Sequence, residues 1–257
     1  MSGVLALQCR VIGALVLRET RSTFGTTQLG YLWAIIEPAA GMALMVLIFS
    51  MVGRQPPFGS SFALFFATGI LVLRFFSKLS SSLMTVFDAN KALLAYPVIK
   101  ETDVLFARAI LIAATYAVIM FALFAGLIWF GLADVPASLD NVLQAFAATF
   151  CLGFGFGTTN AVIISFWDSW KNIERILTRP LFFISGIFYV PSHLPPAAIS
   201  ILKWNPVLHC VEWMRTGFYA NYDSIVIDRS YLIGVALALT LSGLLSERFT
   251  RQWRAKA

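Results

Sequence analysis

The sequence predicts an all-α integral membrane protein with six transmembrane helices, an amphipathic N-terminal interface helix and a re-entrant helical hairpin in the last outer loop. Composition is the first observation: 59% of the 257 residues are hydrophobic and 12% are charged, whereas about a quarter of the residues of a soluble domain are charged. The second is a series of six apolar segments near the length of about 20 residues that crosses a bilayer. The third is an uneven distribution of lysine and arginine between the connections. Together these observations exclude a soluble globule.

The N-terminal segment predicts an amphipathic helix in the membrane interface rather than a cleavable signal peptide. The apolar stretch from Val4 to Leu17 is interrupted by Gln8 and Arg10, and residues 1–9 contain no lysine or arginine, unlike a signal peptide. On a helical wheel the apolar side chains share one side and the arginines the other, as in helices that lie on a bilayer. The apolar side is Val4, Leu5, Val11, Ile12, Leu15 and Val16, and the basic side is Arg10, Arg18 and Arg21.

Six predicted spans follow, of which the last two are short. They cover residues 33–52, 62–87, 105–131, 142–166, 176–190 and 231–246. The first contains Glu37 before Pro38, and a carboxylate at that depth needs a partner or a proton. The sequence leaves open whether Glu37 pairs with a basic residue or lines a substrate path. In the fourth span, the spacing of Gly153, Gly155 and Gly157 predicts close helix packing.

The basic residues predict that both termini are cytoplasmic. With a cytoplasmic N-terminus, thirteen of the 19 lysines and arginines fall in inside segments and four in outside segments, as the positive-inside rule requires. The net charge of +6 therefore reflects topology, and nucleic-acid binding is not expected. We expect one domain over residues 1–257. Its parts are the interface helix and linker (1–30), spans one to five (31–190), the outer loop (191–230), span six (231–246) and a cytoplasmic tail (247–257).

The long outer loop predicts two short helices that enter the membrane and return. Pro195-Pro196 and Asn205-Pro206 separate two apolar segments, 197–204 and 207–219. Asn205 is a favourable N-cap and Pro206 a favourable first helical residue. The second segment reaches only about 20 Å at 1.5 Å per residue, too short to cross.

The connection from Asp88 to Arg108 mixes charged residues with a Tyr-Pro turn. A short helix from Asn90 to Leu94 that stops before Pro97 fits this stretch. The alternative is a plain solvated loop between two spans.

No catalytic motif is present, so we expect a transport protein and not an enzyme. No lysine follows a glycine, which excludes the phosphate loop G-x-x-x-x-G-K-[ST], and neither H-E-x-x-H nor G-x-S-x-G occurs. We expect no metal site: His209 and Glu212 share a helical face, but we interpret them as polar residues on the wet side of an interfacial helix. The three cysteines fall in different compartments of the predicted topology, so no disulfide is expected.

Arg74 and Lys78 are the strongest functional signal in the spans, because they stand four residues apart and share a helical face. Arg74 lies about 18 Å along a helix that starts near Phe62, where a charge costs several kcal/mol unless it meets protein or water. We expect the pair to line the path of an anionic substrate, although Lys78 also has the option of snorkelling to the cytoplasmic surface. Aromatic side chains are expected to offer sugar rings an apolar surface or to close the outer end of the path, the alternative being contact with lipid. They are Phe75, Phe76, Phe182, Phe183 and Tyr189, with Trp204 and Trp213 in the outer loop.

Residues 17–38, LRETRSTFGTTQLGYLWAIIEP, carry a family resemblance. The order of arginines, Phe24-Gly25, Leu29-Gly30-Tyr31, Trp33 and Glu37-Pro38 resembles the start of the membrane subunit of ABC-2-type exporters, and most closely that of the capsule-polysaccharide permeases, the KpsM type. The stretch KWNPVLHCVEWMR at 203–215 is similar to the same permeases, in which this region forms re-entrant helices.

The resemblance implies an exporter of a lipid-linked acidic polysaccharide in the bacterial inner membrane. It implies a homodimer bound to two copies of a separate ATPase, which holds ATP and Mg²⁺, so that this chain needs no cofactor. It also implies a periplasmic adaptor and an outer-membrane channel. Export of O-antigen, teichoic acid or a drug is the alternative within this class, and a membrane enzyme acting on lipid-linked sugars is a more distant one. The residues that the resemblance places against the ATPase are Arg18, Glu19, Arg21, Asn90, Lys91, Leu93, Tyr96 and Lys100.

Overall fold

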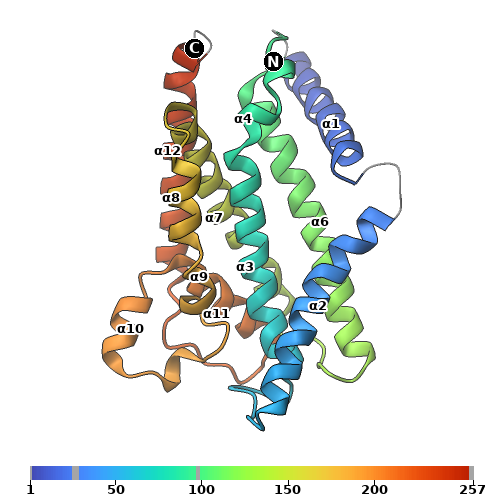
Figure 1. The fold of residues 1–257 in the computed structure, drawn as a ribbon, viewed down its shortest axis with the longest axis vertical. Coiled ribbons are helices and arrows are strands. Elements are labelled where there is room, and N and C mark those ends of the chain that lie inside the picture. Colours follow the sequence, from blue (N-terminus) through green and yellow to red (C-terminus); the bar gives the residue numbers. More distant parts are fainter. Residues whose placement is uncertain (1, 25–28, 97–98, 255–257) are drawn as a thin grey trace.

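The computed structural model describes residues 2–24, 29–96 and 99–254, and within these ranges the chain is helical and contains no strand (Figure 1). The predicted all-α class is thereby confirmed. The long helices are α1 (Ser2–Phe24), α2 (Leu29–Met51), α3 (Phe62–Met84), α6 (Glu101–Trp129), α7 (Leu139–Phe166) and α12 (Arg229–Arg254). The short ones are α4 (Val86–Ala89), α5 (Lys91–Leu94), α8 (Trp170–Thr178), α9 (Leu181–Ile184), η1 (Pro191–His193), α10 (Pro196–Leu202) and α11 (Pro206–Phe218).

Five of the described helices are long and apolar enough to cross a membrane, which makes this a multi-pass membrane protein. They contain segments 32–51, 62–84, 101–129, 139–166 and 229–251, and they correspond to predicted spans one to four and six.

The predicted fifth span, 176–190, is not a continuous helix, so the expected count of six is not confirmed. α8 ends at Thr178 and α9 covers only Leu181–Ile184. Pro180, at the junction, has no N–H to continue the helical ladder. After α9 the chain turns through Gly186, whose φ of +76° favours glycine. α8 and α9 nevertheless follow one another down the molecule (Figure 1).

The core is built on α3 and α7. Most residues of α3 are buried, whereas few residues of α2 and α12 are. Glycines allow the close contacts of α7: a Cβ at Gly155 would lie 2.6 Å from the backbone nitrogen of Thr240, and one at Gly157 would lie 3.0 Å from the Cα of Ser80. The packing role that the glycine spacing predicted is therefore confirmed, and these contacts fix α7 between α3 and α12.

At the end of the molecule that holds α1 and the last turns of α12, polar contacts join α1 to the neighbouring helices (Figure 1). α1 packs along α6 and buries Leu15. Glu19 forms an ion pair with Arg108 of α6, and Arg108 also donates to the backbone oxygen of Ser82 at 3.4 Å. α1 is thereby fastened to both α3 and α6. Its place in the bilayer interface stays a prediction.

Besides η1, the loop at 191–230 contains two α-helices, as predicted, but they differ in burial. α11 is buried against α3, α7 and α12. α10 buries none of its residues and projects from the edge of the fold (Figure 1). The predicted start of α11 is confirmed, because the Asn205 side chain accepts a hydrogen bond from the backbone nitrogen of Val207 at 3.0 Å and Pro206 is the first helical residue. Re-entry into a membrane stays a prediction.

Candidate substrate path

Arg74 and Glu37 form an ion pair between the middle of α3 and the middle of α2. The guanidinium nitrogen lies 3.1 Å from the carboxylate, and the side chains of Arg74 and Glu37 are 35% and 78% exposed. The partner that the sequence left open for Glu37 is therefore Arg74. The pair lies on the surface of this chain at the depth of two predicted spans, so this surface requires protein or water opposite it, not lipid.

A polar stripe continues from Arg74 along α3. Ser77, Lys78, Ser81 and Thr85 follow at helical spacing and share its face. Lys78 is exposed. We call Arg74, Ser77, Lys78, Ser81 and Thr85 the α3 polar stripe. It runs from the ion pair toward the end of the molecule where α1 lies.

α8 lies opposite the hydroxyl-bearing members of this stripe, Ser77, Ser81 and Thr85, and adds basic side chains. A cavity of about 340 Å³ separates the two helices, with hydroxyl groups from α3 on one side and Lys171 and Arg175 on the other. Glu174 also lines it, and burial raises the pKa of this carboxyl although the Arg175 charge opposes the change. The full lining is Phe76, Ser77, Ser80, Ser81, Met84, Thr85, Lys171, Glu174, Arg175 and Thr178.

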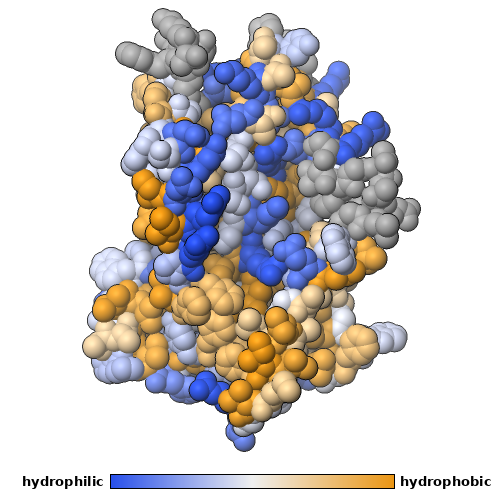
Figure 2. Space-filling model, viewed as in Figure 1, coloured by the Kyte–Doolittle hydropathy of each residue, from blue (hydrophilic) through white to orange (hydrophobic). Residues whose placement is uncertain are grey.

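Figure 2 shows the face on which these helices lie. Hydrophilic side chains gather over its upper half, and mostly hydrophobic side chains cover its lower half. The upper half is the end near α1 and the C-terminal turns of α12. A substrate that moves along this face from that end would therefore meet polar and cationic groups first.

The predicted aromatic contacts divide between surface and core. Phe183 is exposed and joins Phe182 and Phe188, with ring centroids 5.4 and 6.1 Å away. Phe75 is fully buried, stacked 4.6 Å from the ring of Phe146. Phe183 is therefore available to a substrate in this conformation, whereas Phe75 holds α3 against α7.

The two predicted tryptophans, Trp204 and Trp213, also divide between surface and core. Trp204 is exposed beside the ring of Tyr231, at 6.0 Å. Trp213 is buried, its indole donates to Asn141 at 3.4 Å, and Arg229 lies over its ring at 4.8 Å. In this conformation Trp213 joins α11 to α7 and α12 and offers no surface to a substrate.

The residues expected against an ATPase also separate into two groups. Glu19 and Asn90 are buried and bonded within the chain, Glu19 to Arg108 and Asn90 to Arg18 at 3.1 Å. Leu93 is half-buried. The exposed members are Arg18, Arg21, Lys91, Tyr96 and Lys100.

The short helix predicted from Asn90 to Leu94 is confirmed as α5, preceded by α4, which the sequence did not predict. Pro97, where we expected it to stop, lies outside the described residues.

His209 and Glu212 were expected on the wet side of an interfacial helix, and this expectation is wrong. Both are almost completely buried, because α11 packs against α3, α7 and α12. The His209 ring lies 2.7 Å from the Lys203 carbonyl oxygen and accepts from the Asp228 backbone nitrogen at 3.0 Å. Among the described residues, no group of three or more histidine, cysteine or acidic side chains is placed to hold a metal ion.

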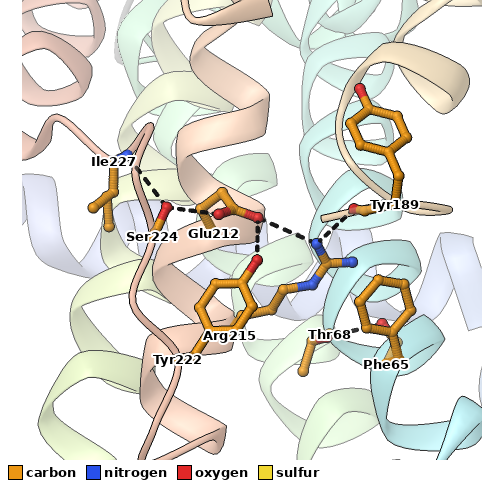
Figure 3. Close-up of polar contacts among 8 residues, drawn as sticks. All are labelled: Phe65, Thr68, Tyr189, Glu212, Arg215, Tyr222, Ser224 and Ile227. Carbon is orange, nitrogen blue, oxygen red and sulfur yellow. Dashed lines mark hydrogen bonds and ion pairs between the residues drawn. The ribbon is translucent and has the colours of Figure 1, made fainter. Parts of the chain in front are cut away.

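Glu212 instead belongs to a buried polar cluster that the sequence analysis missed (Figure 3). Its carboxylate lies 3.2 Å from Arg215 and accepts from Tyr222 at 2.8 Å and Ser224 at 2.6 Å. Arg215 is fully buried, donates to the Tyr189 carbonyl oxygen at 3.3 Å and lies 4.0 Å over the ring of Phe65. The spacing of Glu212 and Arg215 on one helical face was the available signal.

A family model described as ABC-2 type transporter matches residues 10–219. The chain belongs to this family. It is accordingly the membrane component of an ABC-2 type transporter.

Three of its relatives carry names that refer to polysialic acid transport or to capsule polysaccharide export. The polysialic acid transport protein KpsM of Escherichia coli is 31% identical over 236 residues, which cover 91% of this chain and 90% of KpsM. The capsule polysaccharide export inner-membrane protein BexB of Haemophilus influenzae is 28% identical over 93% of this chain and 91% of BexB. The capsule polysaccharide export inner-membrane protein CtrC of Neisseria meningitidis serogroup B is 27% identical over 93% of this chain and 91% of CtrC.

Proposed function

We propose that this chain is the membrane subunit of an ATP-driven exporter that moves a lipid-linked acidic capsular polysaccharide across the bacterial inner membrane. The observation that carries the proposal is the α3 polar stripe, whose cations Arg74 and Lys78 lie within a helix long enough to span the membrane, since cations in such helices mark the path of an ion or charged substrate. The names of KpsM, BexB and CtrC support the substrate class.

The arrangement suits a polymer that must pass without being held. Conduction requires sites that attract the substrate but release it again. Glu37 partly neutralises Arg74 at 3.1 Å, so an anionic sugar competes with a carboxylate already in place. The hydroxyl groups of Ser77 and Ser81 beside it exchange hydrogen bonds with sugar hydroxyls at little net cost.

The working unit in this proposal is a homodimer with two copies of a separate ATPase, which holds ATP and Mg²⁺. The exposed apolar surface of α2 supports a second copy beside the polar stripe. The exposed residues Lys91, Tyr96 and Lys100 face the ATPase, and both termini lie in the cytoplasm. ATP binding closes the ATPase dimer and moves this connection, the spans shift, and the polymer advances between the two copies toward a periplasmic adaptor and an outer-membrane channel.

Deletion of the gene from its native host tests the proposal. We expect capsular polysaccharide to disappear from the cell surface and to accumulate inside, and plasmid-borne wild-type protein to restore export. Immunoblots of surface and total polymer measure this. If the surface capsule is unchanged and O-antigen, teichoic acid or drug resistance is lost instead, the protein exports one of those substrates and not a capsular polysaccharide. Copurification of an ATPase with the tagged chain tests the assembly separately.

A further inference from the structure

An apolar groove lies between α6 and α7, at the end of the molecule away from α1, where these two helices are connected (Figure 1). α6 packs on α1 and α3, whereas α7 packs mainly on α12, α3 and α11. The two consecutive helices therefore diverge and leave a cavity of about 570 Å³ between them. Its lining comes from residues 117–128, 136–146 and 214–218, and every lining side chain in the described part of the chain is apolar.

The groove has a buried floor and an exposed rim. Phe124 of α6 and Met214 and Phe218 of α11 form the floor, because each is at most 7% exposed. The ring centroids of Phe124 and Phe218 lie 4.2 Å apart. Phe121 and Leu143 form the rim, with exposures of 76% and 60%. A ligand that enters past the rim therefore contacts α11, a helix of 13 residues that is too short to cross a membrane.

The depth and the lining of the groove select its ligand. Segments 101–129 and 139–166 are long and apolar enough to cross a membrane, so the groove lies among lipid chains. Water is not suited to it, because an apolar cavity offers no hydrogen bonds. A transmembrane helix is not suited either, because helices in membranes pack closely over small residues, whereas the floor consists of phenylalanine and methionine side chains. A lipid acyl chain is apolar, thin and able to follow such an irregular surface.

The charges beside the groove favour a lipid with an ammonium headgroup. Asp134 lies in the α6–α7 connection and Asp140 in the first turn of α7, and both are exposed. From residue 109 to residue 170 the chain contains no lysine or arginine that would bind an anionic headgroup. Arg229 of α12 donates to Asn141 at 3.0 Å, and Asn141 does not line the groove. The end of the groove at the α6–α7 connection is therefore acidic.

We propose that this groove binds one acyl chain of a phospholipid with an ammonium headgroup, as in phosphatidylethanolamine. The acyl chain fills the space between α6 and α7 and packs on α11, while the ammonium group lies near the carboxylates of Asp134 and Asp140. The lipid thereby supports α11 from the side on which α6 and α7 diverge. This site requires a membrane around the protein and does not depend on the substrate that the protein exports.

The lipid that copurifies with the full-length protein tests the site. The protein is purified in mild detergent from membranes that contain phosphatidylethanolamine and phosphatidylglycerol, and native mass spectrometry identifies the bound lipid. The wild type should retain one phosphatidylethanolamine per chain, and Ala125→Trp, which fills the groove, should lose it. The matched control is Ala238→Trp, at an exposed position of α12 outside the groove, which should retain the lipid. Wild-type retention by Ala125→Trp would overturn the proposal.

The headgroup is tested by competition. In vesicles of equal phosphatidylethanolamine and phosphatidylglycerol content, the wild type should retain several-fold more phosphatidylethanolamine. Asp134→Asn combined with Asp140→Asn should abolish this preference, because the acidic groups that attract the ammonium are neutralised, while one lipid per chain is still bound. Equal retention of the two lipids by the wild type would contradict the assigned headgroup, and so would an unchanged preference in the double variant.

A third measurement uses the wild-type protein and so does not depend on the folding of a variant. Phosphatidylethanolamine with a photoreactive group at the end of one acyl chain is added to the purified protein, and the cross-linked residues are mapped by mass spectrometry. Cross-links should reach Met214 and Phe218 and should be several-fold more frequent in the groove than on the exposed face of α12. Met214 and Phe218 are 1% and 4% exposed, so only a chain inside the groove reaches them. Equal labelling of all spans without α11, or a membrane protein found cross-linked in the groove instead, would overturn the lipid site.

Discussion

Two of the arginine–carboxylate pairs in the described part of the chain have nearly equal lengths but lie in opposite surroundings. Arg74 and Glu37 lie 3.1 Å apart on the polar face, with Glu37 78% exposed. Arg215 and Glu212 lie 3.2 Å apart with exposures of 0% and 1%. An exposed pair contributes little stability and exchanges partners readily, whereas removing one partner from a buried pair leaves an uncompensated charge. In the function that we propose, the same chemistry serves substrate passage at the exposed pair and stability at the buried pair.

The largest expected effect is the loss of the buried pair. Arg215→Ala should destabilise the protein by about 3–5 kcal/mol, as expected when one member of a buried pair is removed. The yield of folded complex in mild detergent and its apparent unfolding temperature measure this. The double variant Arg215→Met with Glu212→Leu should recover most of the lost stability. If Arg215→Ala unfolds at the wild-type temperature, the two pairs do not differ in the way described.

A smaller and different effect is expected at the exposed pair. Arg74→Ala should change stability by no more than about 1 kcal/mol, yet reduce export of an acidic polymer. Arg74→Lys should retain part of the activity, because the charge survives while the planar fork of donors is lost. Surface polymer and extracted complex are measured together, with the double variant Arg74→Ala and Glu37→Ala as the control. If Arg74→Ala and Glu37→Ala each destabilise the complex and the double variant restores its stability, Arg74 is structural and does not line the path.

The smallest expected effect is that of salt, which should weaken the interactions of the exposed pair and leave the buried pair almost unchanged. Raising salt from about 0.1 to about 1 M shortens the Debye length from about 10 to about 3 Å. Binding of an acidic oligosaccharide to the purified complex should weaken over this range, while the unfolding temperature changes little. A neutral oligosaccharide is the control ligand. Arg74→Ala should flatten the salt dependence, and an equally steep dependence in that variant would remove Arg74 from the binding surface.

Much of the fold was predictable because, in a bilayer, the hydropathy of a segment largely determines whether it forms a spanning helix. Apolar segments of about 20 residues have few alternatives to spanning helices, and spans one to four and six correspond to helices of the structure. The start of α11 was predictable from Asn205 and Pro206, whose capping chemistry is local. The break at 176–190 was harder to predict, because hydropathy alone does not weigh a proline and a positive-φ glycine.

The candidate site was predictable in part. Arg74 and Lys78 could be selected from their spacing and the cost of charge in lipid, but the identity of Glu37 as the partner of Arg74 depends on how α2 crosses α3. The basic side chains of α8 entered the sequence analysis only as evidence for topology. Their position opposite the α3 stripe follows from packing between elements about 100 residues apart in sequence.

The sequence by itself determined that this is a helical membrane protein, where most of its spans lie and which cations are unusual within them, because these properties depend on neighbours along the chain. Only the tertiary structure decided which face of each helix is buried. Phe75 and Phe183 both lie in apolar stretches of the sequence, so hydropathy could not place Phe75 in the core and Phe183 on the surface. Glu212 and Arg215 likewise look like surface residues in sequence, and they are buried because α11 is surrounded by α3, α7 and α12.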